Sequence, residues 1–229
     1  MSTWRVNSVK NLALDYGYQE SFDFGTTNES PSFNIPQLDA LFPAGCWPAA
    51  ELSEVLCDKY ETGLQLLLPL LAEQNAQNRW ITLISPPANI DQKLFAFYGI
   101  DMSRVLLIHP KSDVNDKITM NKALKNGKSS IVILWTNNLS TRFLAQWRKS
   151  VKQGSCTGII IHENDNSSNS NSIALAVEAK SSEHNISLRY IKAYGVRQLK
   201  NKTVQLPKVV IEEITGQQSQ CAPAFQLVN

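Results

Sequence analysis

The sequence predicts an α/β protein in which a mostly parallel sheet is flanked by helices and followed by an antiparallel β extension. Short apolar runs alternate with helical patterns over residues 51–161, which is typical of a parallel sheet. The run 130–135 is continuously apolar after Ser130, as expected for a strand covered on both faces. After residue 173 the pattern changes to apolar and polar residues in alternation, which indicates antiparallel strands with one solvated face.

Each element of the predicted sheet follows from a local pattern. Leucines 64, 67, 68 and 71 recur at helical spacing, and Pro69 is expected to kink or end their helix. Gly99 and Gly127 are expected to end the next two helices, and Ser140 to cap the last one. The expected strands are 51–56, 80–85, 105–108, 130–135 and 158–161, and the expected helices are 62–75, 90–98, 115–125 and 140–152.

The chain divides into four predicted parts. Residues 1–35 are polar and aperiodic, apart from the start of a short helix expected over 35–41, and form a predicted N-terminal arm. The α/β core is expected over 36–163 and the β extension over 173–211, with strands around 173–177, 186–190 and 204–206. The polar segment 212–229 is expected to be a flexible tail.

Composition excludes several classes of protein. The 229 residues carry a formal charge of +2 and four cysteines with no C-x-x-C pair, which disfavours a disulfide framework or a zinc site. His109, His162 and His184 lie in separate segments, so no metal and no cofactor is expected. No apolar run reaches about 18 residues and the first residues lack a signal-peptide pattern, so we expect a cytoplasmic protein without membrane contact.

The turn after the first strand is the place where an α/β nucleotide site would have its phosphate-binding loop. The signature G-x-x-x-x-G-K-[ST] supplies backbone amides, a lysine for the phosphates and a hydroxyl for magnesium. Here Gly63 is the only match, because Asp58 replaces the first glycine, Leu64 the lysine and Gln65 the hydroxyl residue. The segment therefore predicts a degenerate loop that binds no nucleotide.

Two further positions agree with the loss of nucleotide chemistry. The strand 131–134 ends in Trp135 instead of an acidic magnesium ligand, and the turn 85–87 contains no acid to activate water. We therefore expect a protein that is not an enzyme. A residual ATPase activity is kept as a third hypothesis, behind the two binding functions described below.

Short segments spread over the core form a recognisable series. They are Leu38-Asp39-Ala40-Leu41-Phe42-Pro43-Ala44-Gly45-Cys46-Trp47-Pro48, 51–56, 66–71, Arg79-Trp80, Ser85-Pro86, Gly99-Ile100, Arg104-Val105 and 154–161. In their order and spacing they resemble the family that contains ImuA and SulA, a branch of the RecA superfamily. The resemblance extends over about 36–162 and more loosely over 173–210, and it implies a degenerate RecA-like core that functions in the SOS response to DNA damage.

The resemblance implies two alternative functions, both performed by binding. The first is an ImuA-type accessory factor for error-prone translesion DNA synthesis, with an ImuB-like polymerase or RecA as partner. The entry segment around Asp39 and Trp47 and the extension 173–206 favour it. The alternative is a SulA-type cell-division inhibitor that binds the tubulin-like protein FtsZ and blocks septum formation.

The same resemblance implies a partner-binding surface on the second strand and the helix that follows it. Arg79 and Arg104 match basic positions important in SulA, Ile84 matches an apolar one, and Leu94 replaces a tryptophan. Aromatic and Arg side chains often dominate binding energy, so the replacement at Leu94 removes an anchor. Trp80, next to Arg79, completes the predicted set.

A second predicted surface is the basic C-terminal extension. Its lysines and arginines are expected to make a weak contact with single-stranded DNA, and two tyrosines among them, Tyr190 and Tyr194, could stack on bases. A solvated ribbon without DNA contact is the alternative. The predicted DNA-binding residues are Arg189, Lys192, Arg197, Lys200 and Lys202.

Overall fold

The structure is a computed structural model that describes residues 31–33, 39, 42, 45–76, 79–87, 90–163, 170–183, 185–193 and 204–207. The predicted arm before residue 31, most of the expected helix at 35–41 and the predicted tail at 212–229 lie outside these residues.

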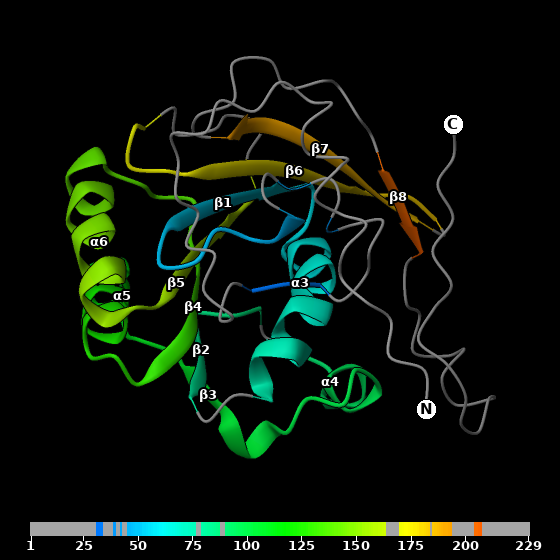
Figure 1. Ribbon diagram of the computed structural model, residues 1–229, viewed down its shortest axis with the longest axis horizontal. Coiled ribbons are helices and arrows are strands. Elements are labelled where there is room, and N and C mark those ends of the chain that lie inside the picture. Colours follow the sequence, from blue (N-terminus) through cyan, green and yellow to red (C-terminus); the bar gives the residue numbers. More distant parts are fainter. Residues whose placement is uncertain are drawn as a thin grey trace.

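The described residues form one eight-stranded sheet with the order β3-β2-β4-β5-β1-β6-β7-β8 (Figure 1). Strands β3 to β6 in this order are parallel, so the predicted mostly parallel sheet is confirmed, and β7 and β8 continue it in antiparallel pairing. The strands are β1 Leu52–Cys57, β2 Trp80–Ile84, β3 Val105–Ile108, β4 Ser129–Trp135, β5 Thr157–His162, β6 Leu175–Ser181, β7 Asn185–Ala193 and β8 Val204–Pro207.

Helices cover both faces of the sheet. Helix α3 (Tyr60–Asn75) packs on one face, with α4 (Gln92–Phe97) beside it, while α5 (Asp113–Lys125) and α6 (Thr141–Gly154) lie side by side on the other (Figure 1). A short 3-10 helix, η3 (Met102–Arg104), leads into β3. Two buried apolar clusters follow from this layering, one under α3 and one under α5 and α6.

Most predicted elements are present within a few residues of their expected bounds. Gly99 and Gly127 end their helices as predicted, each with a left-handed φ of 70°. Ser140 stands at the predicted cap position of α6, but its side chain makes no capping hydrogen bond. Pro69 does not end α3, since the helix continues to Asn75 with Leu70 and Leu71 fully buried against the core.

The prediction for the first strand of the C-terminal extension is wrong in one respect. Strand β6 pairs parallel with β1 and only its other edge pairs antiparallel with β7. Its residues from Leu175 to Ala179 are buried, because β6 is an interior strand of the main sheet. The predicted alternation is confirmed in β7, where Ile186 and Leu188 are buried and Arg189 is exposed.

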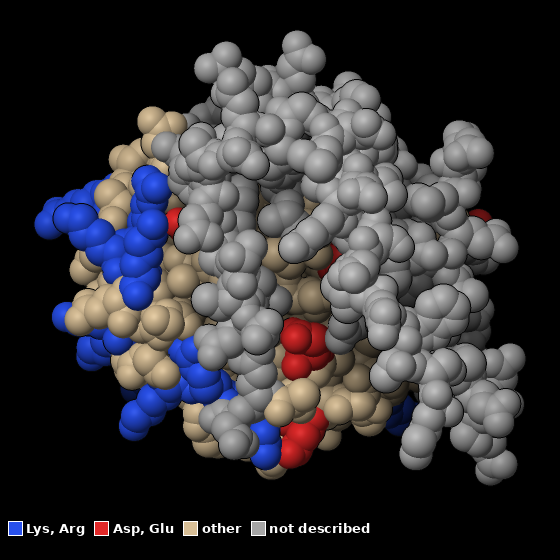
Figure 2. Space-filling view, viewed as in Figure 1, with Lys and Arg blue, Asp and Glu red and all other residues tan. Residues whose placement is uncertain are grey.

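Charge is unevenly distributed over the surface. Figure 2 shows Lys and Arg side chains gathered over α5 and α6, with little acid among them.

No helix among the described residues has the length and apolar character needed to cross a membrane.

Candidate protein-binding surface

The connection from β1 to α3 is too short to surround a phosphate group. It consists of Asp58 and Lys59, so that Gly63, Leu64 and Gln65 lie inside the helix. Two carboxylates lie at this end of the helix: Glu163 accepts a hydrogen bond from the backbone N–H of Tyr60 at 2.9 Å, and Asp58 accepts one from that of Lys59 at 3.0 Å. A helix N-terminus attracts anions, and here this attraction is directed to the protein's own acids.

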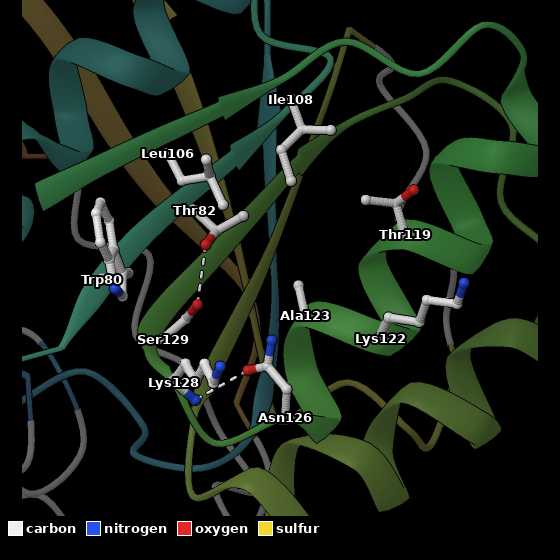
Figure 3. A pocket seen from close by; sticks show the side chains of 10 residues that line it. All are labelled: Trp80, Thr82, Leu106, Ile108, Thr119, Lys122, Ala123, Asn126, Lys128 and Ser129. Atoms are coloured by element: carbon white, nitrogen blue, oxygen red, sulfur yellow. Dashed lines mark hydrogen bonds between the residues drawn. The ribbon is translucent and has the colours of Figure 1, made fainter.

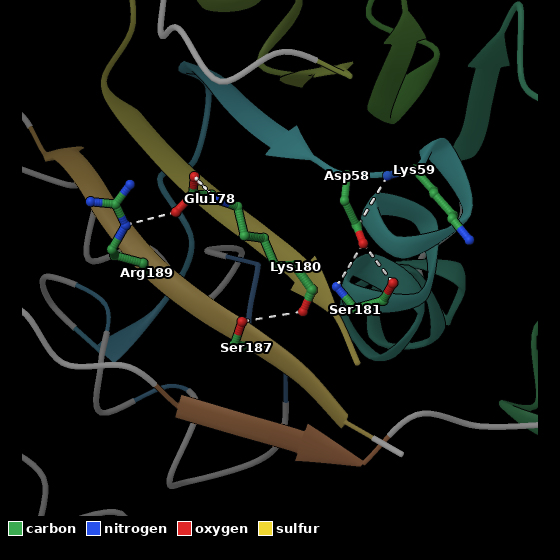
Figure 4. A network of polar contacts seen from close by, with 7 residues as sticks. All are labelled: Asp58, Lys59, Glu178, Lys180, Ser181, Ser187 and Arg189. Carbon is green, nitrogen blue, oxygen red and sulfur yellow. Dashed lines mark hydrogen bonds and ion pairs between the residues drawn. The ribbon is translucent and has the colours of Figure 1, made fainter. Parts of the chain in front are cut away.

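Asp58 has a structural partner on β6. Its carboxylate accepts hydrogen bonds from the Ser181 hydroxyl at 2.6 Å and the Ser181 backbone N–H at 3.1 Å (Figure 4). Partial burial opposes ionisation of Asp58, but the hydrogen bonds from Ser181 and Thr62 outweigh it and hold its pKa below the usual range. Asp58 therefore joins the first strand of the core to the C-terminal extension.

The other residues of the degenerate loop have packing roles. A Cβ atom on Gly63 would lie 2.7 Å from Cγ2 of Ile161, so this glycine allows α3 to approach β5 closely. Leu64 and Trp135 are 4% and 2% exposed and belong to the cluster under α3, while Gln65 is half-buried. Within the described residues, no group of acids, histidines and cysteines could hold a metal ion.

Arg79, a predicted binding residue, is engaged with the fold. Its guanidinium donates hydrogen bonds to the carbonyl oxygens of Ser155 at 2.7 Å, Gly154 at 2.9 Å and Ser129. The first two carbonyls lie at the C-terminal end of α6, where helix carbonyls lack partners within the helix. Arg79 thus ties the end of α6 to the start of β4.

Trp80 is the predicted binding residue that is most available to a partner. It is 45% exposed and lines a groove of about 290 Å³ between the edge of the sheet and α5. Figure 3 shows Trp80, Thr82, Leu106 and Ile108 on the sheet side of this groove and residues of α5 on the other. The groove is also lined by Thr119, Lys122, Ala123, Asn126, Lys128 and Ser129.

Strand β3 forms the open edge of the sheet beside this groove. Its side chains alternate between the two faces, and both Leu106 and Leu107 remain at least 40% exposed. The carbonyl of Ile108 accepts a hydrogen bond from the N–H of Ser85 beyond the end of β2, so the alternation turns the backbone groups of Leu107 toward the open edge. An apolar edge strand with outward-facing backbone groups is suited to pairing with another chain.

The remaining residues of the predicted set differ in exposure. Ile84 is fully buried under α5, and Leu94 is 6% exposed in the cluster under α3, so neither presents its side chain to a partner in this conformation. Arg104 is half-exposed at the start of β3. The structure therefore brings Trp80 and Arg104 to the β2–β3 edge but does not form one surface from all five residues.

The predicted DNA-binding set falls mostly outside the described part of the chain. Arg197, Lys200 and Lys202 lie outside it, and the side chain of Lys192 is not described. Arg189 is half of an ion pair with Glu178 at 2.7 Å, and Lys180 pairs with the same carboxylate at 3.0 Å (Figure 4). DNA contact by this extension stays a prediction.

Sequence reasoning missed the exposed edge and its groove. Leu106 and Leu107 are part of an apolar run that is typical of a buried strand, and only the strand order shows that β3 is at the edge. The short length of this run and the flanking Arg104 and His109 were the available signals, since edge strands are often short and bordered by polar residues.

Comparison with known proteins gives consistent descriptions. Residues 51–158 match the family model "Cell division inhibitor SulA". SulA of Serratia marcescens is 27% identical over 48% of this chain and 66% of its own length, slightly under two thirds. SulA of Yersinia pestis is 26% identical over 63% of this chain and 81% of its own length.

Among solved structures, that of SulA from Pseudomonas aeruginosa is 30% identical, covering 51% of this chain and 100% of that chain with a TM-score of 0.45. The family model and the two sequence relatives from Serratia marcescens and Yersinia pestis all carry the SulA description, so they support the alternative prediction rather than the first prediction, ImuA.

Proposed function

Because this chain belongs to the SulA family, we propose that it inhibits bacterial cell division by binding the tubulin-like protein FtsZ, without catalysing a reaction. Such an inhibitor acts in the cytoplasm, where FtsZ assembles, and is produced in the SOS response. An ImuB-like polymerase or RecA as partner has no support from these SulA relatives.

The single observation that carries this proposal is the exposed apolar edge of the sheet. Trp80, Leu106 and Leu107 are 45%, 45% and 40% exposed, which is unusual for large apolar side chains on neighbouring strands. A partner that covers them removes apolar area from water, and a Trp within such a contact often contributes about 2 kcal/mol or more. The β2–β3 edge is therefore the proposed FtsZ-binding surface.

The short β1–α3 connection supports action by binding instead of hydrolysis. We also propose that the core is RecA-like in origin. The position of β1 inside the parallel sheet, with α3 directly after it, supports this proposal. In open α/β sheets, ligands bind at the carboxyl ends of such strands. Here that place is occupied by Asp58, Glu163 and their hydrogen-bond partners.

Controlled expression in a rod-shaped bacterium tests the proposal. We expect filamentous cells in the absence of DNA damage, and restored division when FtsZ carries substitutions that prevent binding. Trp80→Ala and Leu106→Glu should each abolish filamentation at equal protein level. Val114→Ala is the matched control, because Val114 is 61% exposed but does not line the groove. Normal division at high levels of the folded wild-type protein would reject the proposal.

A further inference from the structure

Positive charge is concentrated in one part of the fold, next to the proposed FtsZ-binding edge, and two of its lysines, Lys122 and Lys128, also line the groove at that edge. Residues 111–155 contain nine Lys and Arg and two Asp residues, a formal charge of +7 within a chain whose total is +2. This segment comprises α5, β4 and α6, and Figure 2 shows its basic side chains over the two helices. The rest of the chain is net acidic, so the charge is segregated by the fold.

The ends of α5 and α6 bring five of these lysines to the same end of the molecule. A Cβ atom on Gly154 would lie 1.9 Å from the carbonyl oxygen of Leu124, so the two helix ends touch through their backbones. One turn earlier, the Ser150 hydroxyl donates to Oδ1 of Asn121 at 2.8 Å and fixes the relative position of the helices. The C-terminal lysine cluster consists of Lys122, Lys125, Lys128, Lys149 and Lys152.

All five lysines of the cluster are exposed. Lys152 forms an ion pair with Glu51 at 2.9 Å, and within the described residues Lys122, Lys125, Lys128 and Lys149 have no salt bridge. Like charges held at two touching helix ends repel one another, and a multiply charged anion relieves that repulsion.

From this arrangement we propose that the C-terminal lysine cluster binds the phosphate backbone of DNA without reading the base sequence. Lysine ammonium groups neutralise phosphates as point charges and release condensed counterions, which provides sequence-independent affinity. Exposed amide side chains accompany the lysines, Asn126 directly after α5 and Gln146 and Gln153 on α6, and amides donate hydrogen bonds to phosphate oxygens.

The absence of apolar anchors favours DNA over a protein or a membrane. None of the large exposed apolar side chains of the described residues lies on α6 or in α5 beyond Ile118. Protein interfaces depend on buried aromatic or aliphatic anchors, and amphipathic helices enter membranes through an apolar face. Lys122 and Lys128 border the groove beside Trp80 and Leu106. Lys125, Lys149 and Lys152 do not line that groove and offer charge and hydrogen-bond donors, which is the chemistry of a phosphate backbone contact.

Fluorescence anisotropy with the full chain tests this proposal. The probes are a labelled single strand of about 30 nucleotides and the duplex of the same sequence, titrated between about 50 and 200 mM salt. The triple variant Lys125→Glu, Lys128→Glu, Lys149→Glu should bind at least about tenfold more weakly. The logarithm of the binding constant decreases linearly with the logarithm of the salt concentration. In the variant this slope should be less steep by about 2.7 for duplex or about 2 for single-stranded DNA if each lysine contacts one phosphate. The two probes distinguish duplex from single-strand binding.

The matched control is the triple variant Lys59→Glu, Lys93→Glu, Lys111→Glu, which changes net charge equally at exposed sites outside the cluster. It should retain most of the wild-type affinity. Equal losses in both variants would mean that net charge alone attracts DNA and would overturn the assignment to the cluster. The proposal would also be overturned if the protein did not bind DNA, or if its DNA affinity did not depend on salt. The same holds if a poly-glutamate peptide bound the protein as tightly as DNA does. An unchanged urea midpoint in both variants verifies that they are folded.

Discussion

Replacement of Arg79 distinguishes a role in binding from a role in the fold. Its guanidinium donates to the carbonyls of Ser129, Gly154 and Ser155, and Arg79→Ala leaves these three acceptors to be hydrated by water. A hydrogen bond from a charged donor contributes about 1.5–3 kcal/mol, and the half-exposed position reduces the total. We expect a loss of about 2–4 kcal/mol in the free energy of unfolding.

Urea unfolding followed by circular dichroism measures this loss, and the melting temperature should fall by about 5–15 °C for a chain of this size. Arg104→Ala removes the other predicted basic residue at the β2–β3 edge and should cost less than about 1 kcal/mol. If Arg79→Ala kept wild-type stability while FtsZ binding was lost, Arg79 would be a contact residue and the structural reasoning would be refuted.

Three further predictions follow from packing, charge and burial. Gly154→Ala should destabilise the fold by about 3 kcal/mol or more, since its Cβ meets the Leu124 carbonyl; urea unfolding with Gln153→Ala as control measures this. The bond from Arg189 lowers the pKa of Glu178 below 4.5, so Glu178 stabilises the fold above that pH and loses its contribution as pH falls through the folded value. Glu178→Gln should therefore be destabilising in urea at neutral pH and nearly neutral at the lowest pH where the protein folds; an equal loss at both would contradict this. Burial raises the pKa of the Cys57 and Cys156 thiols to about 12, so at mildly alkaline pH a thiol reagent should label both only after unfolding, as read by mass spectrometry of peptides.

The sequence predicts the layers of the fold well because they depend on local periodicity. Residues 131–135 are apolar on both faces of the strand and indeed lie in the interior of the sheet. The parallel pairing of β6 with β1 could not be predicted, since strand partners depend on contacts between residues more than a hundred positions apart. Pro69 shows the same limit, because burial of the leucines after it outweighs the local tendency of proline to end a helix.

The candidate site was predicted less completely than the fold. The degenerate loop could be recognised by comparison with a fixed signature, and the short β1–α3 connection agrees with that interpretation. Exposure cannot be derived from residue type, so Ile84 and Leu94 were predicted as contacts although both are buried. The lysine cluster was also missed, because its members are far apart in sequence and meet only where α5 touches α6.

Co-sedimentation with FtsZ polymers, together with light scattering of FtsZ assembly, tests the central claim most directly. We predict that the purified protein binds FtsZ and suppresses its assembly, and that Trp80→Ala weakens binding at least about thirtyfold, equivalent to about 2 kcal/mol. Val114→Ala should bind as the wild type does. A folded protein that leaves FtsZ assembly unchanged, or a Trp80→Ala variant that binds with full affinity, would contradict the account.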